Sequence, residues 1–176
     1  MKKFTALVFL FVGLSLAAQD SGRNYYSFDA SYFYGTIAEH NTDIAHLITG
    51  HPQALILGFN KKSFGFKDWE KRYNYPDVGV SFTYQDMKES ALGENYGLYV
   101  HMNFYLLKRS LMFRIGQGLA YAGNPYHPDV NFRNNAYGSR LLSTTYLMAN
   151  LKKENIIKGF GLQAGLSVIH YSNADF

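Results

Sequence analysis

The amino-acid sequence predicts an all-β protein, an antiparallel β-barrel of the outer-membrane type that follows an export signal. Tyr and Phe are abundant, with 15 and 14 copies, and such residues favour strands. Most of the segments that alternate in polarity are longer than the usual soluble strand of about 5–6 residues. They match the ~9–11 residues that cross a bilayer with tilt. Short and long connections also alternate, as in outer-membrane barrels.

The N-terminus has the pattern of a secretory signal peptide. Lys2 and Lys3 form a charged start, an uncharged run covers 4–17, and small residues precede Gln19. The apolar run is short for a membrane span of about 20 residues, so a retained N-terminal anchor is the weaker interpretation. We therefore expect a signal peptide at 1–18 and a β-barrel domain at 19–176. Loss of the two lysines lowers the formal net charge from +4 to +2, too little to indicate a nucleic-acid partner.

The sequence predicts seven strands in this chain, of about eight in the full protein. They cover roughly Tyr25–Glu39, Gln53–Phe66, Asp77–Gln85, Tyr96–Leu107, Leu111–Ala122, Ser139–Leu151 and Gly159–Ser172. If the first strand runs outward, the short turns at 108–110 and 151–158 lie on the periplasmic side. The long loops at 40–52, 86–95 and 123–138 then lie outside the cell.

Two connections carry further signals. Ile44, Leu47 and Ile48 are compatible with a short helix inside the first long loop. The segment 67–76 is long for a periplasmic turn, and its Trp69 and basic residues are typical of an interfacial anchor.

The last predicted strand has one apolar face and one small, polar face. The apolar row consists of Phe160, Leu162, Ala164, Leu166 and Val168. In a soluble sandwich or a lipocalin-like barrel this row would face a core, whereas in a membrane barrel it would face lipid. The strand lengths favour the membrane.

His170 and Ser172 continue the apolar row on the same face of that strand. Histidine can take the proton of a serine hydroxyl and so activate it as a nucleophile, and Asn173 can donate to an oxyanion. A polar strand end that enters an outer loop is the plainer interpretation of so short a motif. The position at the outer end of a lipid-facing row favours an enzyme that acts on outer-leaflet lipid.

The run Ile169–Ala174 resembles the active-site signature of the lipid A 3-O-deacylase family, the PagL-type acyloxyacyl hydrolases. The signal peptide, the alternating strands and the late position of the motif also fit that family. The resemblance implies an eight-stranded outer-membrane barrel that hydrolyses an ester-linked acyl chain of lipid A in lipopolysaccharide. It implies Ser172 as the nucleophile, His170 as the general base and Asn173 in the oxyanion hole. No cofactor or metal is implied.

The same resemblance does not assign the acidic member of the triad to any residue of this chain. The family's acid follows the serine by about a dozen positions, a spacing taken from the resemblance and used with the logic of a Ser/His/acid triad. Because this chain ends at Phe176 and the strand count is odd, we expect a C-terminally truncated fragment of low activity or stability. Phe176 as a genuine assembly signal is the alternative. Acids within the chain are weaker candidates: Asp175, Glu39, Glu94 and Glu154.

Other polar residues have weaker functional signals. His40, His46 and His51 have no zinc-site spacing and are more simply solvated loop residues. His101 is expected to line a polar interior, and Arg133 and Arg140 are candidates for contact with lipid A phosphates. A non-catalytic outer-membrane barrel and a lipocalin-like lipid binder remain the alternative functions, and the sequence does not indicate an oligomeric state.

Overall fold

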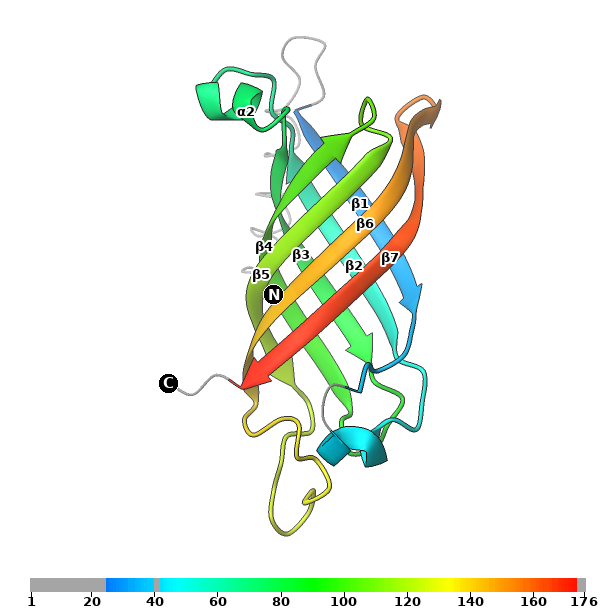
Figure 1. Cartoon of the computed structure of the whole chain (residues 1–176), viewed down its shortest axis with the longest axis vertical. Coiled ribbons are helices and arrows are strands. Elements are labelled where there is room, and N and C mark those ends of the chain that lie inside the picture. The colour runs from blue at the N-terminus through cyan, green and yellow to red at the C-terminus, as the bar shows by residue number, and fades with distance from the viewer. Residues whose placement is uncertain (1–24, 40–41, 174–176) are drawn as a thin grey trace, which may run out of the picture.

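A computed structural model of the protein describes residues 25–39 and 42–173. In this part of the chain one antiparallel sheet holds seven strands in the order β1-β2-β3-β4-β5-β6-β7 and curls into a nearly closed barrel (Figure 1). The strands are β1 (Tyr26–Tyr34), β2 (Gln53–Lys61), β3 (Asp77–Asp86), β4 (Glu94–Leu106), β5 (Leu111–Ala122), β6 (Leu141–Ile157) and β7 (Phe160–Asn173). The predicted signal peptide, His40, Asp175 and Phe176 lie outside the described residues.

The predicted all-β fold and the seven strands are confirmed, but some strand ends were wrong. β1 ends at Tyr34 and not at Glu39, and β2 ends at Lys61 and not at Phe66. β6 continues to Ile157, where the sequence predicted a polar turn after Leu151. Charged side chains there do not stop the strand, because the ladder with β7 is made by backbone groups. It is irregular between Lys153 and Ile157 and ends at the pair of Ile157 and Phe160. The turn itself is made at Gly159, whose φ of 82° suits glycine.

The two ends of the barrel differ as predicted. The tight turns after β4 and β6 lie at one end, and the long loops lie at the other (Figure 1). The first long loop contains the expected short helix, η1 (Thr42–Leu47). A second helix, α2 (Asp68–Arg72), was not predicted, because five residues are too few for a helical period. It is stabilised by Glu70, whose Oε2 accepts the N–H groups of Gly65 at 2.7 Å and Phe66 at 2.9 Å.

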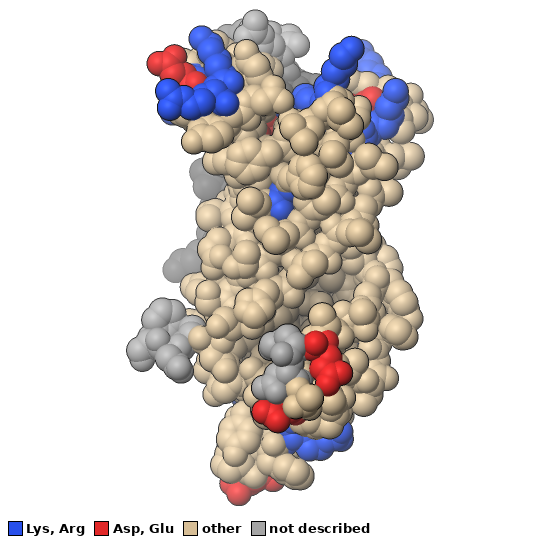
Figure 2. Space-filling view, viewed as in Figure 1, with Lys and Arg blue, Asp and Glu red and all other residues tan. Residues whose placement is uncertain are grey.

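The outer surface of the barrel is apolar around its middle. Outward side chains such as Leu98, Val100 and Leu166 are 66%, 67% and 80% exposed. On the face shown in Figure 2, charged residues gather towards the two ends, and the surface between them is largely free of charge. An apolar surface of this extent would promote aggregation in water, and it matches the lipid-facing band of an outer-membrane barrel.

No helix in the described part of the chain has the length and apolar character needed to cross a membrane.

The interior of the barrel is filled by a polar network centred on Arg114. This side chain is 1% exposed and donates to both carboxylate oxygens of Asp29, at 3.0 Å and 2.7 Å. Its Nε donates to Asn103 Oδ1 at 2.6 Å, and Asn60 links the guanidinium to His101. His101 therefore lines the interior as predicted. A buried ion pair is tolerated here because further hydrogen bonds satisfy the charged atoms.

β1 and β7 face each other without a backbone ladder. In the described residues β1 pairs with β2 alone, and β7 with β6 alone. One side-chain hydrogen bond crosses this β1–β7 seam, from Gln163 Nε2 to Ser31 Oγ at 2.6 Å. The barrel is thus nearly closed, and the strand that carries His170 and Ser172 borders the seam.

Replacing Arg114 should test the interior network. Arg114→Ala leaves the partly buried Asp29 carboxylate without its charged partner, so the free energy of unfolding should fall by roughly 3–5 kcal/mol. The double variant Arg114→Met with Asp29→Leu should recover most of the loss, because no lone charge remains. Urea unfolding in detergent micelles measures both. Lys88→Ala, which removes an exposed pair with Asp86, is the control and should leave the unfolding midpoint unchanged. If Arg114→Ala had the same unfolding midpoint as the wild type, the interior network centred on Arg114 would not stabilise the barrel.

Candidate active site

The motif residues His170 and Ser172 lie at the end of β7 that meets the long loops. Both side chains are exposed on the outward face, in line with the exposed Leu166 and Val168. Alternation along the strand puts them there, since positions two apart share a face. The pair therefore stands where the apolar belt ends and the polar surface begins.

His170 and Ser172 are neighbours, but they are not hydrogen-bonded to each other in the described structure. Two residues of strand rise separate their Cα atoms by roughly 6.6–6.8 Å. A hydrogen bond between the two side chains requires only rotation about their χ angles. Catalytic hydrogen bonds of this kind often shorten when substrate binds.

The residues that alternate with this pair hold the motif from inside the barrel. The Tyr171 hydroxyl donates to Gln85 Oε1 on β3 at 2.7 Å, and its ring meets Tyr137 edge-on with centroids 5.9 Å apart. Asn173 Oδ1 accepts the N–H of Gly138 at 2.7 Å. Thr144 Oγ1 donates to the carbonyl oxygen of His170 at 2.9 Å. The outward pair is thus carried by a backbone that is fixed on its inner side.

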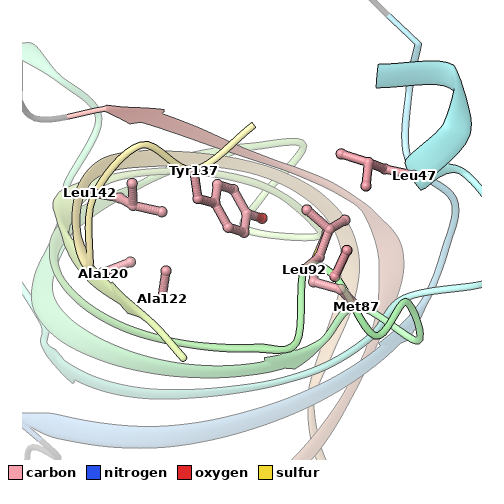
Figure 3. Packing of buried hydrophobic residues seen from close by; sticks show 8 residues of the cluster. Leu47, Met87, Leu92, Ala120, Ala122, Tyr137 and Leu142 are labelled. Atoms are coloured by element: carbon pink, nitrogen blue, oxygen red, sulfur yellow. The ribbon is translucent and has the colours of Figure 1, made fainter. Parts of the chain in front are cut away.

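A small apolar cluster fills the barrel at the long-loop end, and we call it the mouth core (Figure 3). It joins η1, the outer loops 87–93 and 123–140 and the ends of β5 and β6, and Tyr171 packs against it. Its members are Leu47, Met87, Ala91, Leu92, Ala120, Ala122, Tyr137 and Leu142.

Hydrogen bonds tie the outer loops together over the mouth core. Asn134 Nδ2 donates to the carbonyl oxygens of Ala91 and Asn124, at 3.1 Å and 2.7 Å. The hydroxyl of Thr49 donates to Glu89 and holds the pKa of that carboxyl below its usual range. The outer loops are therefore packed against one another, and the end of β7 packs on them through Tyr171.

Three polar side chains interrupt the outward apolar rows of β5 and β6 beside the motif. They are Gln117, Ser143 and Thr145, and we call them the outer polar row. The register of the sheet places Thr145 opposite His170 and Ser143 opposite Ser172. Gln117 lies opposite Thr145 on the next strand. These residues were not predicted from the sequence. Gln117 is a lone polar residue in the outward row of β5, and only the register places it and the β6 residues Ser143 and Thr145 beside the motif.

A shallow apolar groove adjoins the outer polar row on its membrane side. We call it the outer groove; its volume is about 430 Å³, and it lies on the outside of β5, β6 and β7. The outward side chains that line it are Phe113, Ile115, Leu147, Ala149, Leu166 and Val168. In the register Ile115, Leu147 and Val168 form the rung directly next to the rung of Gln117, Thr145 and His170.

No carboxylate in the described residues hydrogen-bonds to His170. Glu94 accepts the hydroxyls of Tyr84 and Tyr96 on the outer face, at 2.9 Å and 2.7 Å. Glu154 pairs with Lys152 at 3.0 Å and lies at the opposite end of the barrel. Glu39 is exposed after β1, and Asp175 lies outside the described residues. The orienting acid of a triad is therefore not identified among these four candidates.

The remaining candidates have local partners. His46 Nε2 lies 2.8 Å from the carbonyl oxygen of Arg133, and His51 Nδ1 lies 3.2 Å from that of Gly35. Arg140 donates to the Tyr121 hydroxyl at 2.8 Å, on the outer surface of the long-loop end. Across the described ranges no group of three or more His, Cys, Asp or Glu residues is arranged to hold a metal ion.

Comparison with known families identifies one match. The family model described as lipid A 3-O-deacylase (PagL) matches residues 53–176, which is more than two thirds of the chain. The matched range runs from the start of β2 through the whole motif. No curated protein and no solved structure matches the chain significantly.

The hydrogen bond from Tyr171 to Gln85 should contribute to the stability of the long-loop end. Tyr171→Phe removes it and leaves the Gln85 amide oxygen without its donor, so the free energy of unfolding should fall by about 1 kcal/mol. Chemical unfolding in micelles measures the change. Tyr32→Phe removes an outward hydroxyl on β1 and should change nothing. Equal effects of the two variants would show that the inner hydrogen bond carries no stability.

Proposed function

This chain belongs to the lipid A 3-O-deacylase (PagL) family, and we propose that it cleaves the acyl ester with Ser172 as nucleophile and His170 as general base. Membership of the family makes the protein a lipid A deacylase, an ester hydrolase of the outer membrane. One observation carries the residue assignment. A serine and a histidine stand side by side on the outward face of β7, where the lipid-facing belt ends.

The proposed reaction proceeds through an acyl-serine. Ser172 Oγ attacks the carbonyl carbon of the ester while His170 takes the hydroxyl proton, and the carbonyl π pair moves onto oxygen. The oxyanion collapses and breaks the bond to the sugar oxygen, which receives the proton from His170. Water then attacks the acyl-serine with His170 again as base. The products are a free fatty acid, a sugar hydroxyl and the restored Ser172.

We assign the oxyanion contribution of Asn173 to its backbone N–H. Its side chain lies on the face opposite to Ser172, and its Oδ1 accepts the N–H of Gly138 at 2.7 Å. A backbone donor has a fixed direction and needs no reorganisation during the reaction, which is the property that makes oxyanion holes effective.

The outer groove supports the choice of a lipid ester as substrate. It is apolar, it opens to the lipid, and it lies one rung from His170 towards the middle of the belt. An acyl chain in this groove would place its ester at the level of His170 and Ser172. The occupant we propose is the ester-linked chain of lipid A that is to be removed.

Export to the outer membrane is proposed to depend on residues 1–18 as a signal peptide, with the barrel domain in 19–176. The charged start, the short apolar run and the small residues at the end of this segment support the assignment.

Substitution of the two motif residues tests the proposed chemistry. Ser172→Ala and His170→Asn should each lower acyl release from lipid A by at least about a thousandfold. The first removes the nucleophile, and the second removes the base that activates it. The measurement is mass spectrometry of lipid A incubated with the protein in detergent micelles. Ser110→Ala, at the opposite end of the barrel, is the matched control. Unchanged acyl release in Ser172→Ala protein that still forms the barrel would refute Ser172 as the nucleophile. Absence of acyl release from folded wild-type protein would favour a non-catalytic barrel.

Filling the outer groove should change the chain-length preference. Ala149→Phe places a ring in the groove and shortens the apolar surface available to the acyl chain. Loss of contact with two methylenes corresponds to roughly a tenfold loss of kcat/KM on long-chain esters, while short-chain esters are unaffected. Ala30→Phe on the outward face of β1 is the control. The same chain-length profile for Ala149→Phe and wild type would remove the groove from the binding site.

A further inference from the structure

The outer polar row is an unusual feature of a lipid-facing surface. Gln117, Ser143 and Thr145 lie among outward residues that are otherwise mostly apolar on β5 and β6, for example Ile115 and Leu147. A polar side chain next to lipid is costly unless it finds a hydrogen-bond partner, and such residues commonly mark functional sites. Here the three side chains partner one another, which reduces that cost.

The hydrogen bonds within the outer polar row run in one direction, from Thr145 through Gln117 to Ser143. The hydroxyl of Thr145 donates to Gln117 Oε1. Gln117 Nε2 then donates to Ser143 Oγ at 3.4 Å. Because the oxygen of Ser143 already accepts from Gln117, the hydroxyl proton of Ser143 points elsewhere and remains available to an outside acceptor.

The free donor lies next to the nucleophile. Ser143 is the direct cross-strand partner of Ser172, and both side chains point outward. Directly opposite residues of antiparallel strands have Cβ atoms about 4.5–5.5 Å apart. An ester carbonyl attacked by Ser172 Oγ therefore comes within reach of the Ser143 hydroxyl. The side chain of Asn173, by contrast, lies on the other face of the sheet.

We propose that Ser143 is a further catalytic residue, whose hydroxyl donates a hydrogen bond to the ester carbonyl oxygen and to the oxyanion formed at Ser172. Gln117 and Thr145 are positioning residues, because they hold the Ser143 hydroxyl in the direction of the substrate. This inference rests on the proposed function. It adds to the signature motif a donor from β6 that the motif itself does not contain.

The test compares three variants in the full chain with lipid A in detergent micelles. Ser143→Ala should lower kcat by about ten- to a hundredfold with little change in KM, since a donor that acts on the developing charge is lost. Ser143→Thr keeps the hydroxyl and should retain most of the activity. Gln117→Met keeps the side-chain size but removes the hydrogen bonds with Thr145 and Ser143, and it should lower kcat by several fold. Ser110→Ala is the matched serine control, and resistance of the barrel to unfolding in dodecyl sulfate shows that each variant has folded.

A second readout does not depend on turnover. A fluorophosphonate reacts covalently with an activated serine and places its phosphoryl oxygen where the ester oxyanion would lie. The rate of labelling at Ser172, measured by intact-protein mass spectrometry, should fall in Ser143→Ala and stay near wild type in Ser143→Thr. A general loss of folding would slow both variants alike.

The outcomes separate this inference from the function on which it rests. If Ser172→Ala leaves acyl release and labelling unchanged, the proposed function itself is wrong. If Ser172→Ala abolishes both but folded Ser143→Ala keeps the wild-type kcat and labelling rate, the proposed function stands and the role of Ser143 is overturned. Equal losses in Ser143→Ala and Ser143→Thr would also overturn it, because the hydroxyl would then not be the group that matters.

Discussion

Alternation of side chains along each strand, between lipid on one side and a packed polar interior on the other, is the constraint on which this structure depends. The outward rows are apolar enough to face hydrocarbon. The inward rows carry groups such as Arg114 and Asp29, which can be polar because they satisfy one another away from lipid. The same alternation divides the motif on β7 into outward and inward residues, so that the exposed pair His170 and Ser172 alternates with residues that are held on the inner side.

That division gives the candidate site a rigid base. His170 and Ser172 face outward, while Tyr171 binds Gln85 across the barrel and packs on the mouth core. A site built on a strand with fixed inner neighbours holds its geometry better than one on a free loop. The surrounding surface also changes from apolar to polar within one rung of the sheet, from the outer groove to the outer polar row. A lipid ester changes in the same order, from an apolar acyl chain to a polar ester group.

Much of the fold could be predicted because its signals are local. Period-two alternation and strand length are readable from a single segment, and they predicted seven strands, the bounds of β5 and the difference between the two ends. The errors arose where local polarity and backbone pairing disagree. β6 continues through Lys152 and Lys153 because its ladder with β7 continues. The helix α2 escaped prediction because one turn carries no period, and it depends on the contacts of Glu70 with backbone N–H groups.

For the site, the sequence by itself determined that His170 and Ser172 share one face of the last strand, since residues two apart on a strand share a face. Only the tertiary structure decided what surrounds them. The register of β5, β6 and β7 sets Ser143 opposite Ser172 and Thr145 opposite His170. Curling of the sheet brings Arg114 to Asp29, 85 positions away in the chain. Such partners depend on how backbone groups of separate strands pair, and the polarity pattern of one strand carries no record of the register of the next.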